Sequence, residues 1–468
     1  MDGSTFPDED LVDLQEEGAI DAVTTTCPAV DVEIAMFFDG TGNNLANVEE
    51  GNRVRANGGA TSEPSYENDL SNVAKLYQSY ARLVPSVVRN DCGGIGKRRF
   101  AEIIDGIGTT SGQEDSVLGF AVGWGITGVE ERVKEGFLRF LQRLNEAKAA
   151  GEIKSIKLDV FGFSRGSAAA RHFVNCVRRG NAGHGYGGPY YELQEEDKPK
   201  LEIRFLGLFD TVVSWGLIAN DSNWGRLKIT LPDDIATKIV HITALDEHRE
   251  NFPLTEAPAS AETIRMPGAH SDIGGGYADF FVERVEVERP RSDFDNFNPR
   301  PSETHEVHGF DAFTAEDMAI FNRLVAQGWI RPTDRSALTR EYTPVSNNPY
   351  DPYWNRWFLT RDWLRNPRLA HVSLHVMFEK AVEAGVPFVS LLPGENYDLP
   401  ESDLVLAQLK ADLMAGRVFT PAETIPYRRD YVHHSANWAP SGPVFPMQPH
   451  EGASRRTVYG NDGSLQAD

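Results

Sequence analysis

A glycine–serine turn carries the most reactive residue pattern in the sequence. Residues 156–161 are mostly apolar and lead into the G-x-S-x-G pentapeptide at residues 162–166, with small residues at 167–170. A strand, a tight turn and a helix in this order are typical of a nucleophile elbow, which presents a serine hydroxyl above a sheet. The pattern predicts that Ser164 is a nucleophile, and an ordinary Gly–Ser turn is the simpler alternative.

A serine nucleophile needs a base and an acid, and two later segments supply them. Asp210 ends an apolar stretch at residues 205–209, and His270 lies in a glycine-rich loop. Serine, then acid, then histidine is the chain order of α/β-hydrolases. In such a triad the imidazole accepts the serine proton, and the carboxylate orients the imidazole and stabilises its charged form. We therefore predict Ser164, Asp210 and His270 as the catalytic residues.

Other residues could take two of these roles. Asp272 is the main alternative acid, although its place two residues after His270 favours a role in bracing the loop. We favour Asp210, because it follows a predicted strand. The alternative bases are His248, His433 and His434, whereas His172, in the helix after the elbow, is expected to be a packed or surface residue.

The anionic intermediate of acyl transfer needs hydrogen-bond donors that form an oxyanion hole. The amide of Arg165, directly after the nucleophile, is the first predicted donor. The second is predicted in the loop after residues 32–38, where Gly40 or Thr41 is best placed. This loop could instead be a simple turn or a phosphate-binding loop, but no lysine or paired metal-binding aspartate follows it.

The sequence predicts no metal and no cofactor. His305 and His308 are too close for the H-E-x-x-H spacing of a zinc helix. Asp293, Asp295 and Asn298 lack the glycine and closing glutamate of a calcium loop. The three cysteines are widely spaced, which indicates neither a zinc pair nor a disulfide framework.

Alternating strand and helix patterns surround the predicted triad. A helix is predicted over residues 127–150, and the helix after the elbow should end near Gly180. The predicted strands are residues 32–38, 101–104, 156–161, 203–209, 239–245 and 263–266. This alternation predicts an α/β fold, with a mostly parallel sheet and helices on both faces. Functional loops of such a sheet gather at the carboxyl ends of its strands.

The alternation also suggests a domain organisation. Residues 1–30 are predicted to be an acidic flexible tail, and residues 31–280 a catalytic domain of the α/β-hydrolase type. Beyond residue 280 proline, aspartate, asparagine and aromatic residues dominate, with one predicted helix at 371–384. We expect residues 281–468 to form a mixed or irregular cap, or a second subdomain, that packs on the catalytic domain and serves membrane or substrate access.

Charge and hydropathy exclude several functions. The formal net charge of −23 argues against nucleic-acid binding, which needs a basic face. It also means that any membrane contact must be local rather than broadly electrostatic. The N-terminus is acidic and lacks the basic start of a secretory signal, and no apolar run approaches a membrane span of ~20 residues. We expect a protein that is made in a cytoplasm and exported, if at all, without a cleavable signal.

Five motifs in order resemble one known family. They lie at residues 37–44, 162–166, 205–212, 244–249 and 268–277. Together they are similar to the bacterial phospholipase effectors delivered by type VI secretion, in the first class of lipase effectors. Residues 373–388 and 431–435 resemble later segments of that family, so the resemblance runs from about residue 32 to about residue 440.

The resemblance implies an activity, a triad and partners. It implies a phospholipase A-type serine esterase, with Ser164, Asp210 and His270 at the family's triad positions. It implies a phospholipid membrane substrate, a cognate immunity protein, and a secretion-tip or adaptor protein. It also implies delivery into the periplasm or membrane of a target cell. The alternatives are a non-secreted carboxylesterase or lipase, and a catalytically idle binding module on the same scaffold.

Aromatic residues in the C-terminal region suggest a membrane contact. Tryptophan and tyrosine favour the lipid headgroup zone, because each joins an apolar ring to a polar edge. The residues concerned are Trp329, Tyr350, Tyr353, Trp354, Trp357, Phe358 and Trp363, with Arg356, Arg361 and Arg365 among them. The alternative is that they form the core of a small second domain.

Overall fold

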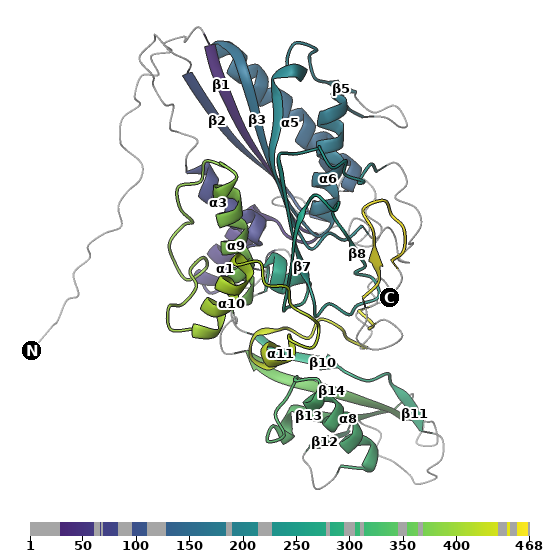
Figure 1. Ribbon diagram of the computed structural model, residues 1–468. Helices are drawn as coiled ribbons and strands as arrows, with labels where there is room; N and C mark the ends of the chain where they lie inside the picture. Colours follow the sequence, from purple (N-terminus) through teal and green to yellow (C-terminus); the bar gives the residue numbers. More distant parts are fainter. Residues whose placement is uncertain are drawn as a thin grey trace, which may run out of the picture.

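A six-stranded parallel sheet forms the centre of the computed structural model (Figure 1). Its strands are β1 (Ala29–Phe38), β2 (Gly96–Ile104), β3 (Glu152–Phe163), β6 (Leu201–Phe209), β7 (Lys238–Ala244) and β9 (Glu262–Met266). Their order is β2-β1-β3-β6-β7-β9, and every neighbouring pair is parallel. The predicted parallel sheet is confirmed, and each predicted strand lies in one of these elements.

The structure describes most of the chain, in separate ranges. These are residues 29–59, 66, 69–82, 96–109, 128–183, 190–213, 227–277, 281–293, 305–308, 313–344, 353–363, 368–438, 447–449 and 456–466. Nearly all of the predicted acidic tail lies outside the described residues, and so do Asp295, Asn298, Tyr350 and Arg365.

The two faces of the sheet are covered by different helices, because successive side chains of a strand point to opposite faces. On β1, Met36 packs with helices α5 (Val129–Ala150) and α6 (Arg165–Arg179). Its neighbour Phe37 packs with α3 (Asn72–Ala81) and α9 (Leu369–Glu383). Figure 1 shows these two pairs of helices on opposite sides of the sheet. The predicted helices at 127–150 and 371–384 are thus α5 and α9.

A second, antiparallel sheet lies below the first in Figure 1. It contains β10 (Phe281–Glu286), β11 (Arg291–Asp293), β12 (His305–His308), β13 (Leu338–Pro344) and β14 (Tyr353–Trp363). Helix α8 (Ala315–Ala326) packs against it, and Trp357 Nε1 donates to Asp317 Oδ1 at 2.8 Å. The alternation of strands and helices stops near residue 280 because antiparallel strands need no crossover helices.

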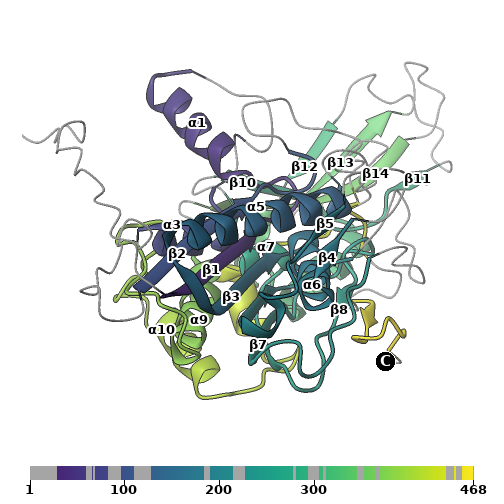
Figure 2. The same ribbon diagram turned by 90° about the horizontal axis from the view of Figure 1, so that it is seen from above.

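After β14 the chain returns to the first sheet. Helix α9 lies on that sheet with α10 (Leu404–Met414) beside it, as Figure 2 shows. Helix α11 (Ile425–Tyr431) follows, and β15 (Val458–Tyr459) pairs in parallel with β8 (Leu254–Thr255). Residues 281–468, predicted as one region, therefore divide between a second sheet and elements that pack beside the first. The remaining elements are short: α1 (Leu45–Ala56), β4 (Asn181–Ala182), β5 (Tyr191–Glu192), the 3₁₀ turns Lys198–Lys200 and Arg335–Ala337, and α7 (His270–Gly274).

Burial is described for four of the aromatic residues proposed for membrane contact, and three of them are core residues. Trp329, Trp357 and Phe358 are buried, whereas Trp354 is 40% exposed. Arg356 and Arg361 form ion pairs with the buried Glu286 and Glu283. For Trp329, Trp357 and Phe358 the burial favours the alternative that the sequence analysis left open, a packed core. Among the described helices, none has the length and apolar composition that crossing a membrane requires.

Candidate active site

Ser164 occupies a strained turn between β3 and α6. Its φ of 58° and ψ of −127° lie in a region that residues with a side chain rarely adopt. A Cβ on Gly162 would lie 2.6 Å from the carbonyl oxygen of Gly166, and a Cβ on Gly166 would lie 2.3 Å from that of Asp39. Glycine is therefore required on both sides of the serine, as a nucleophile elbow demands.

The elbow is joined directly to the loop that carries Asp210. The amide of Ser164 donates to the carbonyl of Phe209 at 3.0 Å, and the Ser167 hydroxyl donates to the same carbonyl at 3.0 Å. Asp210 follows and also has a positive φ, 41°. The adjacent strands β3 and β6 thus end together, and each strand end presents one predicted catalytic residue.

His270 begins α7 and contacts Asp210. The distance from His270 Nδ1 to Asp210 Oδ2 is 2.5 Å, and both side chains are buried. The His270 ring also packs against Phe163, the residue before Ser164, with ring centroids 4.7 Å apart. Among the described residues, no hydrogen bond joins the Ser164 hydroxyl to His270. Such bonds are commonly long before substrate binds.

A residue that the sequence analysis missed completes this cluster. Arg456 Nη1 donates to Asp210 Oδ1 at 2.7 Å, and Nη2 donates to Oδ2 at 2.8 Å. Arg456 Nε donates to the carbonyl of Phe252 at 2.6 Å. No local sequence signal marks this arginine, because its partner Asp210 lies 246 residues earlier in the chain.

Burial and charge act in opposite directions on the acid. Burial alone would raise the pKa of Asp210, but the Arg456 guanidinium and the hydrogen bond with His270 hold that pKa well below its usual value. Burial lowers the pKa of His270, and Asp210 offsets this only in part. At neutral pH the site therefore holds an ionised carboxylate beside a neutral imidazole, the state that a general base requires.

Two acids of the 244–249 motif support the His270 loop. Glu247 accepts from the amide of His270 at 3.2 Å and pairs with Arg249 at 2.7 Å. Asp246 accepts from the amide of Gly268 at 2.9 Å, and Arg428 Nε donates to it at 2.7 Å. These buried carboxylates fix the backbone on either side of the imidazole.

Asp272, the alternative acid, has a different partner. Its carboxylate lies 2.5 Å from His433 Nδ1 and accepts from the amide of Ala269 at 2.9 Å. It therefore braces α7 against the segment that follows α11. His172 Nδ1 accepts from the Lys228 amide, and burial lowers the pKa values of His172 and His434 to about 4.

The predicted oxyanion loops meet above the elbow. Arg165 opens α6, and its side-chain Nε donates to the Thr41 hydroxyl at 2.7 Å. The amide of Gly40 donates to Asp39 Oδ1 at 2.7 Å, so this donor is engaged in the present state. Asp39 is buried, which raises its pKa to about 7.

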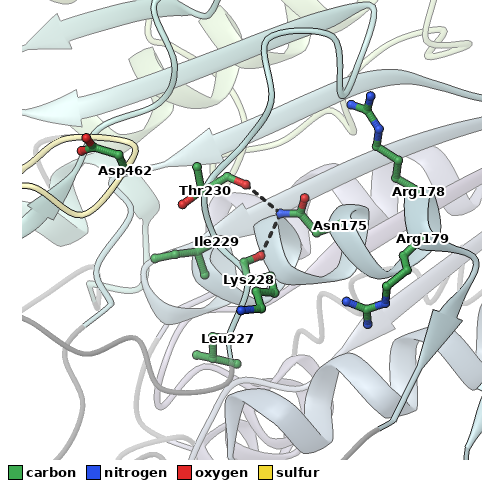
Figure 3. Close-up of a pocket in the computed structure, with 8 residues that line it drawn as sticks. All are labelled: Asn175, Arg178, Arg179, Leu227, Lys228, Ile229, Thr230 and Asp462. Carbon is green, nitrogen blue, oxygen red and sulfur yellow. Dashed lines mark hydrogen bonds between the residues drawn. The ribbon is translucent and has the colours of Figure 1, made fainter.

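A cavity of about 550 Å³ lies at the far end of α6, away from the triad (Figure 3). Figure 3 shows Asn175 donating to the carbonyls of Lys228 and Thr230 at its centre. Its lining is Asn175, Arg178, Arg179, Leu227, Lys228, Ile229, Thr230 and Asp462. The residues with chemistry for acyl transfer lie at the other end of the helix. Within the described ranges, no three His, Cys, Asp or Glu side chains are grouped to hold a metal ion.

Comparison with known proteins adds a family to this geometry. Residues 190–286 match the family model of the type VI secretion Tle1-like phospholipase effectors, catalytic domain. This segment contains Asp210, the 244–249 motif and His270. Over this segment the chain is similar to the Tle1-like effectors.

A solved structure extends the likeness over nearly the whole chain. The Tle1 effector bound to the VgrG spike of the type VI secretion system is 26% identical, with a TM-score of 0.64. The match covers 93% of this chain and 94% of that one. An uncharacterised protein from Pseudomonas aeruginosa is 18% identical over 86% of this chain and 52% of its own, with a TM-score of 0.39. No curated protein sequence matches the chain.

Proposed function

We propose that this protein is an antibacterial phospholipase of the type VI secretion system, which hydrolyses acyl esters of membrane phospholipids. The observation that carries the proposal is a strained serine turn beside Asp210 on neighbouring strand ends, with the buried His270 in contact with Asp210. The likeness to the Tle1-like effectors supports a lipid substrate for this chemistry. The finer assignment is a serine hydrolase of the phospholipase A1 or A2 type.

The proposed mechanism has two acyl-transfer steps. His270 Nε2 accepts the proton of Ser164 as the hydroxyl attacks the ester carbonyl, and Asp210 stabilises the imidazolium that forms. The imidazolium then gives the proton to the leaving lysophospholipid alkoxide, which leaves an acyl-serine. Water, deprotonated by the same imidazole, releases the fatty acid and restores the serine.

Two oxyanion donors are part of this proposal. The amide of Arg165 begins α6, where the helix dipole favours negative charge. The second donor is an amide of the Gly40–Thr41 pair. Because the Gly40 amide donates to Asp39 in the present state, its use requires that Asp39 release it when substrate binds.

Delivery and partners follow from the same likeness. We infer that the protein is loaded on a VgrG-type spike, as the Tle1 effector of the solved structure is. We also infer that it acts in the periplasm or membrane of a target cell, and that an immunity protein protects the producing cell. Co-purification with a spike protein encoded beside it tests the first of these inferences.

The experiment that tests the activity is covalent labelling of the serine. We expect a fluorophosphonate to modify Ser164, and Ser164→Ala to abolish both labelling and release of fatty acid from phospholipid vesicles. The oxyanion hole and substrate binding alone leave only a small residual rate. Labelling of another serine with intact activity contradicts the assignment. A folded protein that binds vesicles without hydrolysing them indicates a binding module instead.

A further inference from the structure

The described C-terminal segment reaches the candidate acid from far along the chain. We call residues 456–466 the C-terminal strap. Its strand β15 pairs with β8, and the amide of Leu254 donates to the carbonyl of Thr457 at 2.9 Å. On its other side β8 bonds to the residue after the acid, because the amide of Thr255 donates to the carbonyl of Thr211 at 3.0 Å. In Figures 1 and 2 the strap is the yellow segment beside β8.

The first residue of the strap holds both oxygens of Asp210. The planar guanidinium of Arg456 matches the carboxylate in a fork, which fixes direction as well as distance. Asp210 Oδ1 accepts in addition from the amide of Ala244 at 3.0 Å, and Oδ2 faces His270 Nδ1. The orientation of the carboxylate toward the imidazole is therefore set jointly by Arg456 and the Ala244 amide.

The middle of the strap is fastened to the elbow helix. Asn461 Oδ1 accepts from Arg171 Nη2 at 2.6 Å and from the amide of Leu231 at 3.0 Å. Arg171 is fully buried on α6, the helix that Ser164 introduces. The strap thus connects the element that carries the nucleophile to the residue that orients the base.

A permanent cation on Asp210 also changes how the pair with His270 responds to protons. Arginine stays charged at all working pH values, so part of the carboxylate charge is always neutralised. A neutralised carboxylate stabilises an imidazolium less, and His270 keeps its base form to lower pH. The other charged groups acting on the imidazole are Arg249, which opposes protonation, and Glu247, which favours it.

We propose that Arg456 is a positioning residue for Asp210, and that the C-terminal strap holds the His270–Asp210 pair in its catalytic geometry. The inference rests on the proposed serine hydrolase function. Arg456 acts through Asp210 and need not touch the substrate, so its loss should change kcat and the pH profile rather than KM.

The first experiment separates the contribution of the Arg456 charge from that of its paired hydrogen bonds to Asp210. It uses the full-length chain and a soluble short-chain ester as the substrate. For Arg456→Gln we expect kcat to fall about 10- to 100-fold with KM nearly unchanged, because a misplaced catalytic group costs about that much. The acid limb, which is the low-pH part of the profile of kcat against pH, should shift to higher pH by about one unit. The reason is that His270 is protonated more easily once a nearby positive charge is lost. Arg456→Lys should restore the acid limb but only part of kcat. Arg417→Gln, at an exposed ion pair with Asp412, is the matched control and should behave as wild type.

The second experiment asks whether Arg456 works through Asp210. In an Asp210→Asn background, Arg456→Gln should cost less than about 3-fold, because residues that act as a unit are not additive. A full additional loss, or a lowered melting temperature with an unchanged acid limb, would show a general structural role and overturn the proposal. If Arg456→Gln does not fold, Asn461→Ala loosens the middle of the strap and should move kcat and the acid limb in the same directions.

The outcomes separate this inference from the proposed function. A wild-type protein without Ser164-dependent hydrolysis contradicts the proposed function itself. A wild-type protein that hydrolyses the ester, with Arg456→Gln keeping its kcat and acid limb, leaves that function standing and overturns the role of Arg456.

Discussion

His270 is the residue whose ionisation should limit the rate at low pH. Burial lowers its pKa below the ordinary value of about 6.5, and only the neutral imidazole can accept the serine proton. We therefore expect kcat/KM to rise with pH, with a midpoint below 6.5, and to stay level up to pH 8. A pH series with a soluble ester measures this. A midpoint well above 6.5 would mean that the imidazole is more basic than its buried site predicts.

The two aspartates near His270 should differ in their effect on turnover. Asp210→Asn leaves the imidazole without its carboxylate, and we expect kcat to fall by about 10⁴, as in other triads. Asp272→Asn disturbs His433 and the start of α7, so it should reduce the melting temperature more than kcat. Ester kinetics and thermal unfolding of both variants distinguish the roles. A larger loss of kcat in Asp272→Asn, with the fold intact, would reverse the assignment of the acid.

At the scale of elements, α7 must pack very closely against the elbow. A Cβ on Gly274 would lie 2.0 Å from the Phe163 ring, which separates α7 from β3 and contacts His270. We expect Gly274→Ala to displace this ring and lower kcat about 100-fold, because the base and the nucleophile move apart.

A second glycine provides the control for this substitution. Gly416 has a φ of 79° and open space where a Cβ would stand. Gly416→Ala should lower the free energy of unfolding by about 1–2 kcal/mol, because alanine is disfavoured at this positive φ, and should leave kcat unchanged. Equal kcat values for the two alanine variants would contradict the packing argument.

The elements that the sequence predicts well are those with continuous apolar runs. Strands of a parallel sheet are buried on both faces, so β1, β3, β6 and β7 read clearly from residue types alone. The elbow and the glycine that ends α6 are also visible, because tight turns restrict residue type. The second sheet is much harder to predict, because half of each antiparallel strand is polar and charged residues such as Glu283 and Arg361 pair within it.

Contacts between distant segments cannot be read from local patterns. Arg456 and Asp210 are 246 residues apart, and His433 and Asp272 are 161 apart. Each histidine and aspartate of the site could be proposed from its neighbours in sequence, but their pairing depends on how the sheet and the returning C-terminal segments meet. The triad therefore remains a prediction that needs the labelling experiment.

At the scale of the whole molecule, the second sheet has buried aromatic residues and, among its described side chains, one exposed tryptophan. Trp357 is fully buried, so Trp357→Ala should lower the free energy of unfolding by about 3–5 kcal/mol. Trp354 is 40% exposed, and Trp354→Ala should change stability by less than about 0.5 kcal/mol. Urea unfolding of both variants measures these differences.

The same pair of variants tests whether the second sheet contacts lipid. If Trp354 inserts at a bilayer surface, Trp354→Ala should reduce hydrolysis of phospholipid vesicles and leave hydrolysis of a soluble ester unchanged. If hydrolysis of both substrates stays at the wild-type rate, Trp354 has no interfacial role.

The contact between Arg456 and Asp210 should form late during folding, and this has a consequence for when activity appears. Paired strands of the sheet lie at most 124 residues apart in sequence, as Phe38 and Gly162 do, whereas the contact between Arg456 and Asp210 closes a loop of 246 residues. Contacts of long sequence separation form late, because the chain entropy of closing such loops must be overcome first. After dilution from denaturant, we expect the far-UV circular dichroism signal to recover before esterase activity. During that interval the protein would hold its helices and strands as a catalytically silent enzyme.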